Sequence, residues 1–272
     1  MNFSKKSVFA FSLSAFFLLA SLSSCTKSDN VPPVGMGHLY FDLHNYINQV
    51  EADSGTVLSD VTGRRFKLTS AQFYISSIQI FNFTTNNAYI LPLNTVFLKT
   101  LANNVYYVAD VPAGSYGQIL YNVGLTPAQN STNPSMYPAG NPLAAQTAPN
   151  LPMYWNASEG YISMNIQGLA DTTKAHNGPV NFPFSYQIGG NNMTEHVWLP
   201  AVQALPLPIQ QFTILPGQNT YVHQICDYGN LLYGIPFVHT ATPFNSNSTT
   251  AWQVAFRVRD CFINYQLPTV GP

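Results

Sequence analysis

Short runs of alternating apolar and polar residues recur along this chain and restrict it to one class of fold. Successive side chains of a β-strand point to opposite faces, so an apolar residue at every second position marks a strand with one buried face. Turn-forming clusters such as Pro112-Ala113-Gly114 and Pro216-Gly217-Gln218-Asn219 separate the runs. The ten predicted strands are His38 to His44, Phe73 to Phe83, Tyr89 to Leu93, Tyr106 to Val111, Gly117 to Val123, Tyr161 to Gln167, Phe182 to Ile188, Phe212 to Leu215, Thr220 to Ile225 and Ala251 to Ile263. No stretch is convincingly helical, and this pattern is typical of a sandwich or barrel.

The composition agrees with an all-β domain and excludes several other classes of protein. Only 8% of the 272 residues are charged, against about 25% in a typical soluble domain. Ten basic and 11 acidic residues provide no positive field for phosphates, which makes nucleic acid an unsuitable partner. Hydrophobic residues make up 46% of the chain, which is ample for a core and excludes disorder. We predict a single antiparallel β-sandwich with long loops over residues 38–272.

The N-terminal residues have the pattern of an export signal followed by a tether. Two lysines lie within Met1 to Lys6, and the apolar stretch Ser7 to Leu22 is too short for a membrane-spanning helix. The segment Leu22-Ser23-Ser24-Cys25 resembles the lipobox of bacterial lipoproteins, which implies cleavage before Cys25 and acylation of its sulfur. The alternative is an ordinary cleaved signal with a chance cysteine. We expect residues 1–24 to be a lipoprotein signal peptide and residues 25–37 a lipidated tether.

The lipid anchor, if present, determines where the protein is located and whether the other two cysteines are oxidised. An acylated Cys25 would attach the protein to a membrane of the cell envelope, as an outer-membrane lipoprotein facing either the periplasm or the surface. Cys226 and Cys261 would then lie in an oxidising compartment, where disulfides persist. We predict a disulfide between them that ties neighbouring strands. The alternative is a pair of thiols that serve as soft metal ligands, although they lack the spacing of a thiolate site.

The run from His38 to His44 carries the clearest candidate for a metal site. If it is a strand, Leu39, Phe41 and Leu43 face the core, while the residues between them share the other face. Neutral imidazoles and a carboxylate suit zinc or copper, and a ligand from another strand would complete the shell. We therefore take His38, Asp42 and His44 as candidate ligands. The alternative is that they are ordinary solvated polar residues on the wet face of a first strand.

No catalytic signature is present in the sequence. It contains no Gly-rich phosphate loop, nucleophile elbow, haem-attachment motif or H-E-x-x-H helix. A glycosidase pair of Asp42 with Glu159 or Glu195 has no support from its spacing. We therefore expect a non-enzymatic role. The segment from Thr126 to Pro152 is expected to contribute to it, because a loop of this length inside a compact domain is usually functional.

A longer motif follows this loop directly. Met153, Tyr154, Trp155, Gly160 and Tyr161 belong to the run M-Y-W-x-x-x-x-G-Y-I-x-x-x-x-x-G, which resembles the signature of the MbnP-like family. Three further segments agree with that family in sequence and in order. They are Phe73 to Ile78, Tyr121 to Leu125 and Phe184 to Gly190. The resemblance implies an exported β-sandwich, including lipoproteins of Bacteroidetes, that is associated with copper.

In some members of that family a tryptophan is oxidised to kynurenine by a periplasmic dihaem peroxidase, which the resemblance therefore implies as a possible partner here. Two positions depart from the family pattern. Ala157 stands where a second tryptophan is common, and Gln187 where a histidine is common. Trp155 is either the oxidised residue or an aromatic that packs under the long loop. The overall expectation is copper binding or handling, and the alternative is a metal-free surface or structural module that contacts a protein or glycan.

Overall fold

The computed structural model describes residues 35–82, 89–190, 195–199, 211–237, 249–264 and 269–271. The expected signal peptide, Cys25 and the tether as far as residue 34 lie outside these residues. The first strand begins at Met36, two residues before the predicted start of the domain. Within the part of the chain that is described, no helix combines the length and the apolar character needed to cross a membrane.

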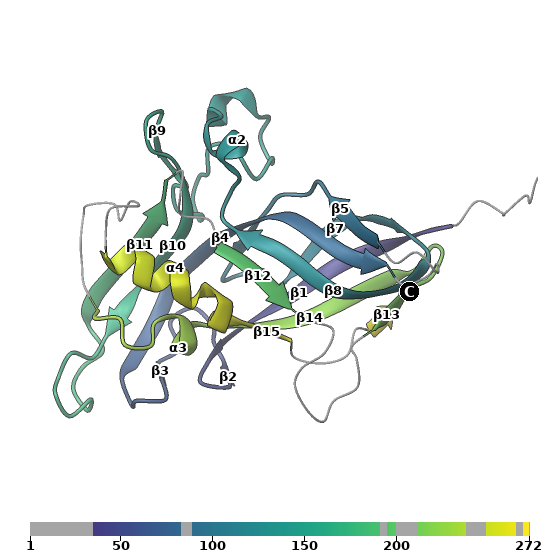
Figure 1. The fold of residues 1–272 in the computed structure, drawn as a ribbon. Helices are drawn as coiled ribbons and strands as arrows, with labels where there is room; N and C mark the ends of the chain where they lie inside the picture. Colours follow the sequence, from purple (N-terminus) through teal and green to yellow (C-terminus); the bar gives the residue numbers. More distant parts are fainter. Residues whose placement is uncertain are drawn as a thin grey trace, which may run out of the picture. The chain divides into compact units, whose positions relative to one another are not determined.

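The described strands form two sheets (Figure 1). The six-stranded sheet contains β1 (Met36–Ile47), β2 (Val50–Glu51), β7 (Val105–Pro112), β14 (Asn219–Asp227), β15 (Phe262–Asn264) and β16 (Thr269–Gly271). The ten-stranded sheet contains β3 (Leu58–Ser59), β4 (Arg65–Asn82), β5 (Tyr89–Leu93), β6 (Phe97–Thr100), β8 (Gly114–Val123), β9 (Tyr154–Asn156), β10 (Gly160–Ala170), β11 (Phe182–Gly189), β12 (Glu195–Leu199) and β13 (Phe212–Ile214).

The two sheets bury their facing apolar residues in one common core. On β1 the residues Leu39, Phe41 and Leu43 are fully buried, while the residues between them are half-buried on the outer face. The ring of Phe41 lies 6.0 Å from that of Phe97 on β6 and 5.8 Å from that of Tyr121 on β8, so it joins the two sheets. The predicted all-β sandwich and the predicted alternation of the first strand are therefore confirmed.

One strand pairing differs from the antiparallel prediction. β1 and β14 are parallel neighbours, with Asp42 opposite His223, whereas the other described pairings are antiparallel. Parallel neighbours require a long crossover connection, and here nearly the whole sandwich lies between the two strands in sequence. The parallel pair brings the polar face of β14 beside the polar face of β1.

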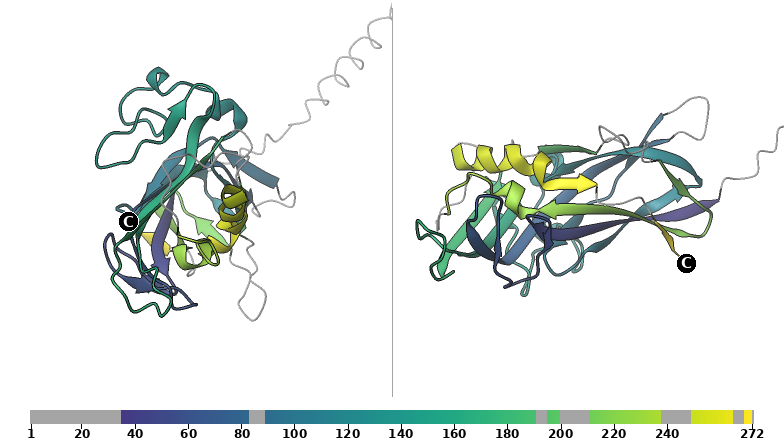
Figure 2. Two further views of the ribbon diagram at one scale, coloured as in Figure 1. Left: turned by 90° about the vertical axis from the view of Figure 1, so that its left-hand side faces the viewer. Right: turned by 90° about the horizontal axis from the view of Figure 1, so that it is seen from below.

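The predicted strand from Ala251 to Ile263 is wrong. Most of this segment is the helix α4 (Thr249–Cys261), and only its end belongs to β15. The buried residues recur at spacings of three and four, which is the period of a helix rather than of a strand. They are Ala251, Val254, Ala255, Val258 and Cys261. Figures 1 and 2 show α4 lying alongside the short helix α3 (Tyr228–Leu231), and it also contacts β11 and β12.

The loop from Thr126 to Pro152 contains no strand. It holds the short helix α2 (Pro127–Asn130) and the 3-10 turn η2 (Pro134–Met136), and Figure 1 shows α2 projecting beyond the strands. A second hydrophobic cluster lies beneath it, separate from the main core. This loop cluster consists of Tyr74, Leu98, Leu125, Leu143, Met153, Tyr161 and Ile162. The loop is therefore packed on the sandwich through its own apolar contacts.

Candidate metal site

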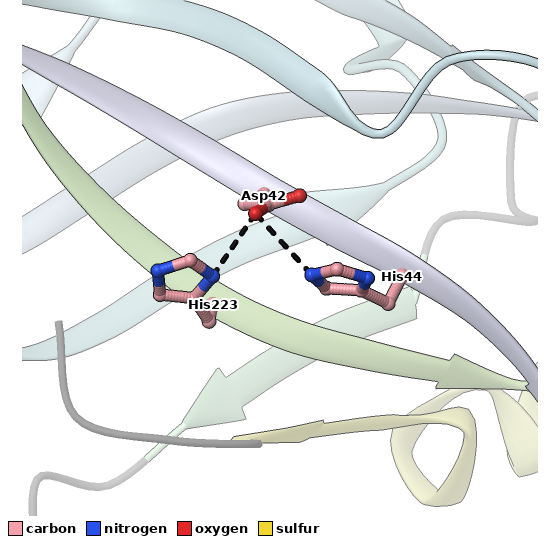
Figure 3. Close-up of side chains that lie close together, drawn as sticks. All are labelled: Asp42, His44 and His223. Atoms are coloured by element: carbon pink, nitrogen blue, oxygen red, sulfur yellow. Dashed lines mark ion pairs between the residues drawn. The ribbon is translucent and has the colours of Figure 1, made fainter. Parts of the chain in front are cut away.

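Three side chains that can ligate a metal meet on the outer face of the six-stranded sheet (Figure 3). Asp42 and His44 share this face because they are two residues apart on β1, and the parallel register places His223 of β14 beside them. One carboxylate oxygen, Oδ2 of Asp42, lies 3.0 Å from Nδ1 of His223 and 3.2 Å from Nε2 of His44. One potential ligand atom from each residue lies within 4.8 Å of the others. We call these three residues the Asp-His-His cluster.

The spacing and the donor types of the cluster fit a transition metal. Two ligand atoms bound tetrahedrally at 2.0–2.1 Å to one ion lie about 3.3 Å apart. The 3.0 and 3.2 Å separations within the cluster are close to that value. Two imidazoles with one carboxylate form a donor set suited to zinc or copper. The side chains of Asp42, His44 and His223 are 14%, 24% and 11% exposed, so the cluster is sheltered yet open to solvent on one side.

Glu51 lies on the far side of the His44 ring. Its Oε1 atom is 3.6 Å from Nδ1 of His44, while Nε2 of the same ring faces Asp42. A tight turn at Asn48 and Gln49, both with positive φ, folds β2 back on β1 and brings Glu51 to this position. A carboxylate on the outer nitrogen of a metal-binding histidine orients the ring and fixes its tautomer. Glu51 is therefore a candidate positioning residue.

His38, the third residue predicted from the sequence, lies outside the cluster. Its Nδ1 atom is 2.6 Å from Oδ1 of Asp110 on β7, and the hydroxyl of Tyr107 donates to the same oxygen at 2.8 Å. The hydrogen bonds from His38 and Tyr107 lower the pKa of Asp110. Tyr40 stands between His38 and Asp42 on this face of β1 and stacks on Tyr221, with ring centroids 5.1 Å apart.

His223 is the candidate ligand from a second strand, which the sequence analysis expected but did not identify. The sequence predicts a strand from Thr220 to Ile225, but it leaves His223 as one of several scattered histidines. What the sequence lacked was any sign that this strand lies beside β1 in parallel register. The predicted need for a ligand from a second strand is therefore met by a histidine 179 residues beyond His44, for which there was no local signal.

The motif residues after the long loop form a different region, on the ten-stranded sheet. Trp155 lies on β9 and is half-buried, and it packs against the loop cluster. Its indole nitrogen donates to the side-chain oxygen of Gln187 on β11 at 3.2 Å. Trp155 thus contacts the very position at which the family pattern often has histidine. Met153 and Tyr161 are buried in the same cluster, and Gly160 has a φ of +79°, which favours glycine.

The two cysteines are fully buried and adjacent. Their sulfur atoms lie 3.2 Å apart as free thiols, with Cys226 on β14 and Cys261 at the end of α4. Burial raises the pKa of the Cys261 thiol. Burial alone would also raise the pKa of Cys226, but a hydrogen bond with Cys261 and the nearby Lys99 ammonium lower it. Only one of the two cysteines lies on a strand, in contrast to the prediction, and the disulfide itself stays a prediction.

Comparison with known proteins supports one family assignment. Comparison with curated proteins gave no match. Among solved structures, MbnP from Methylosinus trichosporium matches at 13% sequence identity and a TM-score of 0.45, over 80% of this chain and 88% of the other. The family model of MbnP matches residues 36–251, which include the Asp-His-His cluster and Trp155. Because this match covers most of the chain, the protein belongs to the MbnP family.

Proposed function

We propose that this protein binds copper at the Asp-His-His cluster. The observation that carries the proposal is the convergence of two imidazoles and one carboxylate from adjacent strands, at separations that suit ligands of one ion. Zinc would accept the same donor set. Copper is favoured because the motifs around Trp155 resemble those of copper-associated proteins, and because copper binds more tightly than zinc to a given nitrogen and oxygen site.

In this proposal each residue has a distinct role. His44 and His223 supply imidazole nitrogens, and Asp42 supplies the negative charge that offsets part of the charge of the ion. Glu51 holds the His44 ring through its outer nitrogen. Bound copper would supply a redox-active centre near the surface of the sheet. Its partial exposure would let copper be loaded and released, as a copper-handling role requires.

The proposal is tested by titrating the purified protein with Cu(I), Cu(II) and Zn(II) and by measuring its metal content by mass spectrometry. We expect one copper ion per chain. Replacing His44→Ala or His223→Ala should lower copper affinity at least tenfold, which corresponds to about 1.4 kcal/mol. His38→Ala is the matched control on the same strand face and should leave affinity unchanged. A protein that ignores both copper ions would instead support a metal-free module that contacts a protein or glycan.

The proposal has two further parts, which concern the cellular location of the protein and its enzyme partner. Acylation of Cys25 would hold the domain at a membrane of the cell envelope, and intact-mass measurement of the protein from its native membrane tests this.

A periplasmic dihaem peroxidase is the proposed oxidant of Trp155. Coexpression with such an enzyme should change the mass of a peptide that contains Trp155. An unmodified peptide would leave Trp155 with its packing role under the loop.

A further inference from the structure

Hydrogen bonds with buried strand residues anchor the long loop to the sandwich. Tyr74 donates to the carbonyl of Pro142 at 3.1 Å, and Tyr161 donates to that of Leu143 at 2.8 Å. Further along, the side chain of Gln72 accepts from the amide of Leu151 at 2.7 Å. Together with the loop cluster, these bonds fix the middle and the end of the loop. The loop is therefore preorganised, which reduces the entropy cost of binding a ligand.

Despite these anchors, part of the loop does not pack directly against the strands. A hollow of about 510 Å³ lies between it and residues of β6 and β7. This volume falls in the range of about 300–1,000 Å³ that is typical of small-molecule sites. The lining residues are Phe97, Leu98, Thr100, Tyr106, Ala139, Gly140, Asn141, Pro142, Ala144, Ala145, Gln146, Thr147 and Asn150. The lining residues come from the loop, from β6 of the ten-stranded sheet and from β7 of the six-stranded sheet, and none of them belongs to the Asp-His-His cluster.

The lining combines an apolar wall with neutral hydrogen-bonding groups. Phe97, Leu98 and Pro142 provide apolar surface. Gln146 is occupied in shaping the loop, because it donates to the carbonyls of Pro142 and Ala144. Among the described residues, three side-chain groups of the lining have no hydrogen-bond partner and are available to a ligand. They are the amide nitrogen of Asn141, the hydroxyl of Thr147 and the carbonyl oxygen of the Asn150 side chain.

This chemistry selects among ligand classes. Among the residues that the structure describes, no charged side chain lines the hollow, so an ionic ligand would lose hydration there without gaining a counter-charge. A wholly apolar ligand would leave the amide and hydroxyl groups unpaired, which is costly. Sugar hydroxyls both donate and accept hydrogen bonds, and the carbon–hydrogen faces of a sugar ring are apolar. We propose that this hollow binds a neutral saccharide of one or two rings, as a function separate from metal binding.

The proposal is tested by saturation-transfer NMR and calorimetry on the purified protein. The probes are glucose, N-acetylglucosamine, maltose and cellobiose, with glucuronate as a charged analogue and triglycine as a neutral peptide. At least one neutral sugar should bind. Glucuronate should bind at least tenfold more weakly than glucose, because its carboxylate finds no counter-charge.

Substitutions at the lining of the hollow test whether the sugar binds there. Thr147→Trp and Ala145→Trp place a large ring at exposed positions that line the hollow, so each should weaken sugar binding at least tenfold while the fold persists. Ala128→Trp is the matched control, since Ala128 is an exposed residue of α2 that does not line the hollow. Absence of sugar binding, binding of triglycine or glucuronate instead, or a wild-type sugar affinity in both hollow-filling variants would overturn the proposal. Copper affinity should be the same in all three variants.

Discussion

At the scale of single residues, the carboxylate of Asp60 joins two segments that are far apart in the sequence. It is buried and accepts hydrogen bonds from the amide and hydroxyl of Thr62 and from Arg64 Nε at 2.8 Å. Arg64 in turn donates to the carbonyls of Leu232 and Ile235, just beyond α3. Burial alone would raise the pKa of Asp60, but the hydrogen bonds from Thr62 and Arg64 outweigh it and lower the pKa.

Asp60→Asn should therefore destabilise the protein by about 3 kcal/mol, because it leaves the Arg64 guanidinium without its charge partner. The lowered pKa also sets a pH dependence. Above the ordinary carboxyl pKa the pairing is fully present, and it is lost as the pH falls through the lowered pKa of the folded state. Urea denaturation at several acid pH values should show that the free energy of unfolding falls less steeply with decreasing pH in Asp60→Asn than in the wild type. Asp53→Asn, at an exposed position, is the control, and equal effects of the two changes would contradict this account.

Lys99 is a second buried charge, and we expect it to cost stability. Its ammonium donates to the side chain of Asn45 and to the carbonyl of Thr100, and within the described residues no carboxylate lies in ion-pair range. Burial lowers the pKa of Lys99 below its usual 10.5. Between those two pKa values the unfolded chain binds more protons than the folded one, so the free energy of unfolding contributed by this group rises with pH.

Lys99→Met keeps most of the side-chain volume and removes the charge. At neutral pH it should raise the free energy of unfolding by about 1 kcal/mol or more, and it should remove the rise with pH that Lys99 contributes. Denaturation of both proteins at several pH values measures the difference. The control is Lys174→Met, since Lys174 is exposed. A Lys99→Met protein less stable than the wild type would show that the hydrogen bonds of the ammonium outweigh its desolvation.

At the scale of secondary-structure elements, the two cysteines offer a link between β14 and α4. The sulfur atoms, 3.2 Å apart, need to approach to about 2.05 Å to form a disulfide. With oxidised glutathione as oxidant, the two thiols would lose two electrons and two protons, and two reduced glutathione molecules would leave. We expect a mass lower by two hydrogens and a raised melting temperature that dithiothreitol reverses.

Cys226→Ser should then cost roughly 2–5 kcal/mol under oxidising conditions, because the bridge closes a loop of 35 residues. Under reducing conditions the same variant should differ less from the wild type, which separates loss of the bridge from loss of packing. An identical melting temperature of the wild type with and without reductant would count against the bridge.

The same elements show what sequence patterns can predict here. β1 was predictable because one of its faces is buried and the other is wet, so its period of two is clear over His38 to His44. In α4 the exposed Trp252 and Phe256 mask the helical spacing of the buried residues, so the sequence pattern predicts a strand there. Asp42 and His44 follow from strand parity alone. His223 depends on a long-range pairing that no local pattern encodes.

At the scale of the whole molecule, the two separate hydrophobic clusters predict two levels of stability. The main core spans both sheets, whereas the loop cluster ties the Thr126–Pro152 loop to one part of the ten-stranded sheet. Local units with fewer buried contacts open at lower free energy than the core. Loosening the loop should therefore leave the strands that carry the Asp-His-His cluster intact, so that the metal site and the sugar site can be perturbed independently.

Leu143→Ala tests this separation, because Leu143 is buried in the loop cluster and contributes nothing to the main core. The cavity should lower the local free energy of opening by about 2–5 kcal/mol. Hydrogen exchange followed by mass spectrometry should then show faster exchange at loop amides such as that of Leu151, with unchanged protection in β1 and β14 and unchanged copper affinity. Leu39→Ala, in the main core, should instead reduce protection in both sheets. If Leu143→Ala also reduced protection in β1 and weakened copper binding, the loop and the metal site would belong to one cooperative unit. A ligand bound in the hollow would then stabilise that unit and, with it, the copper site.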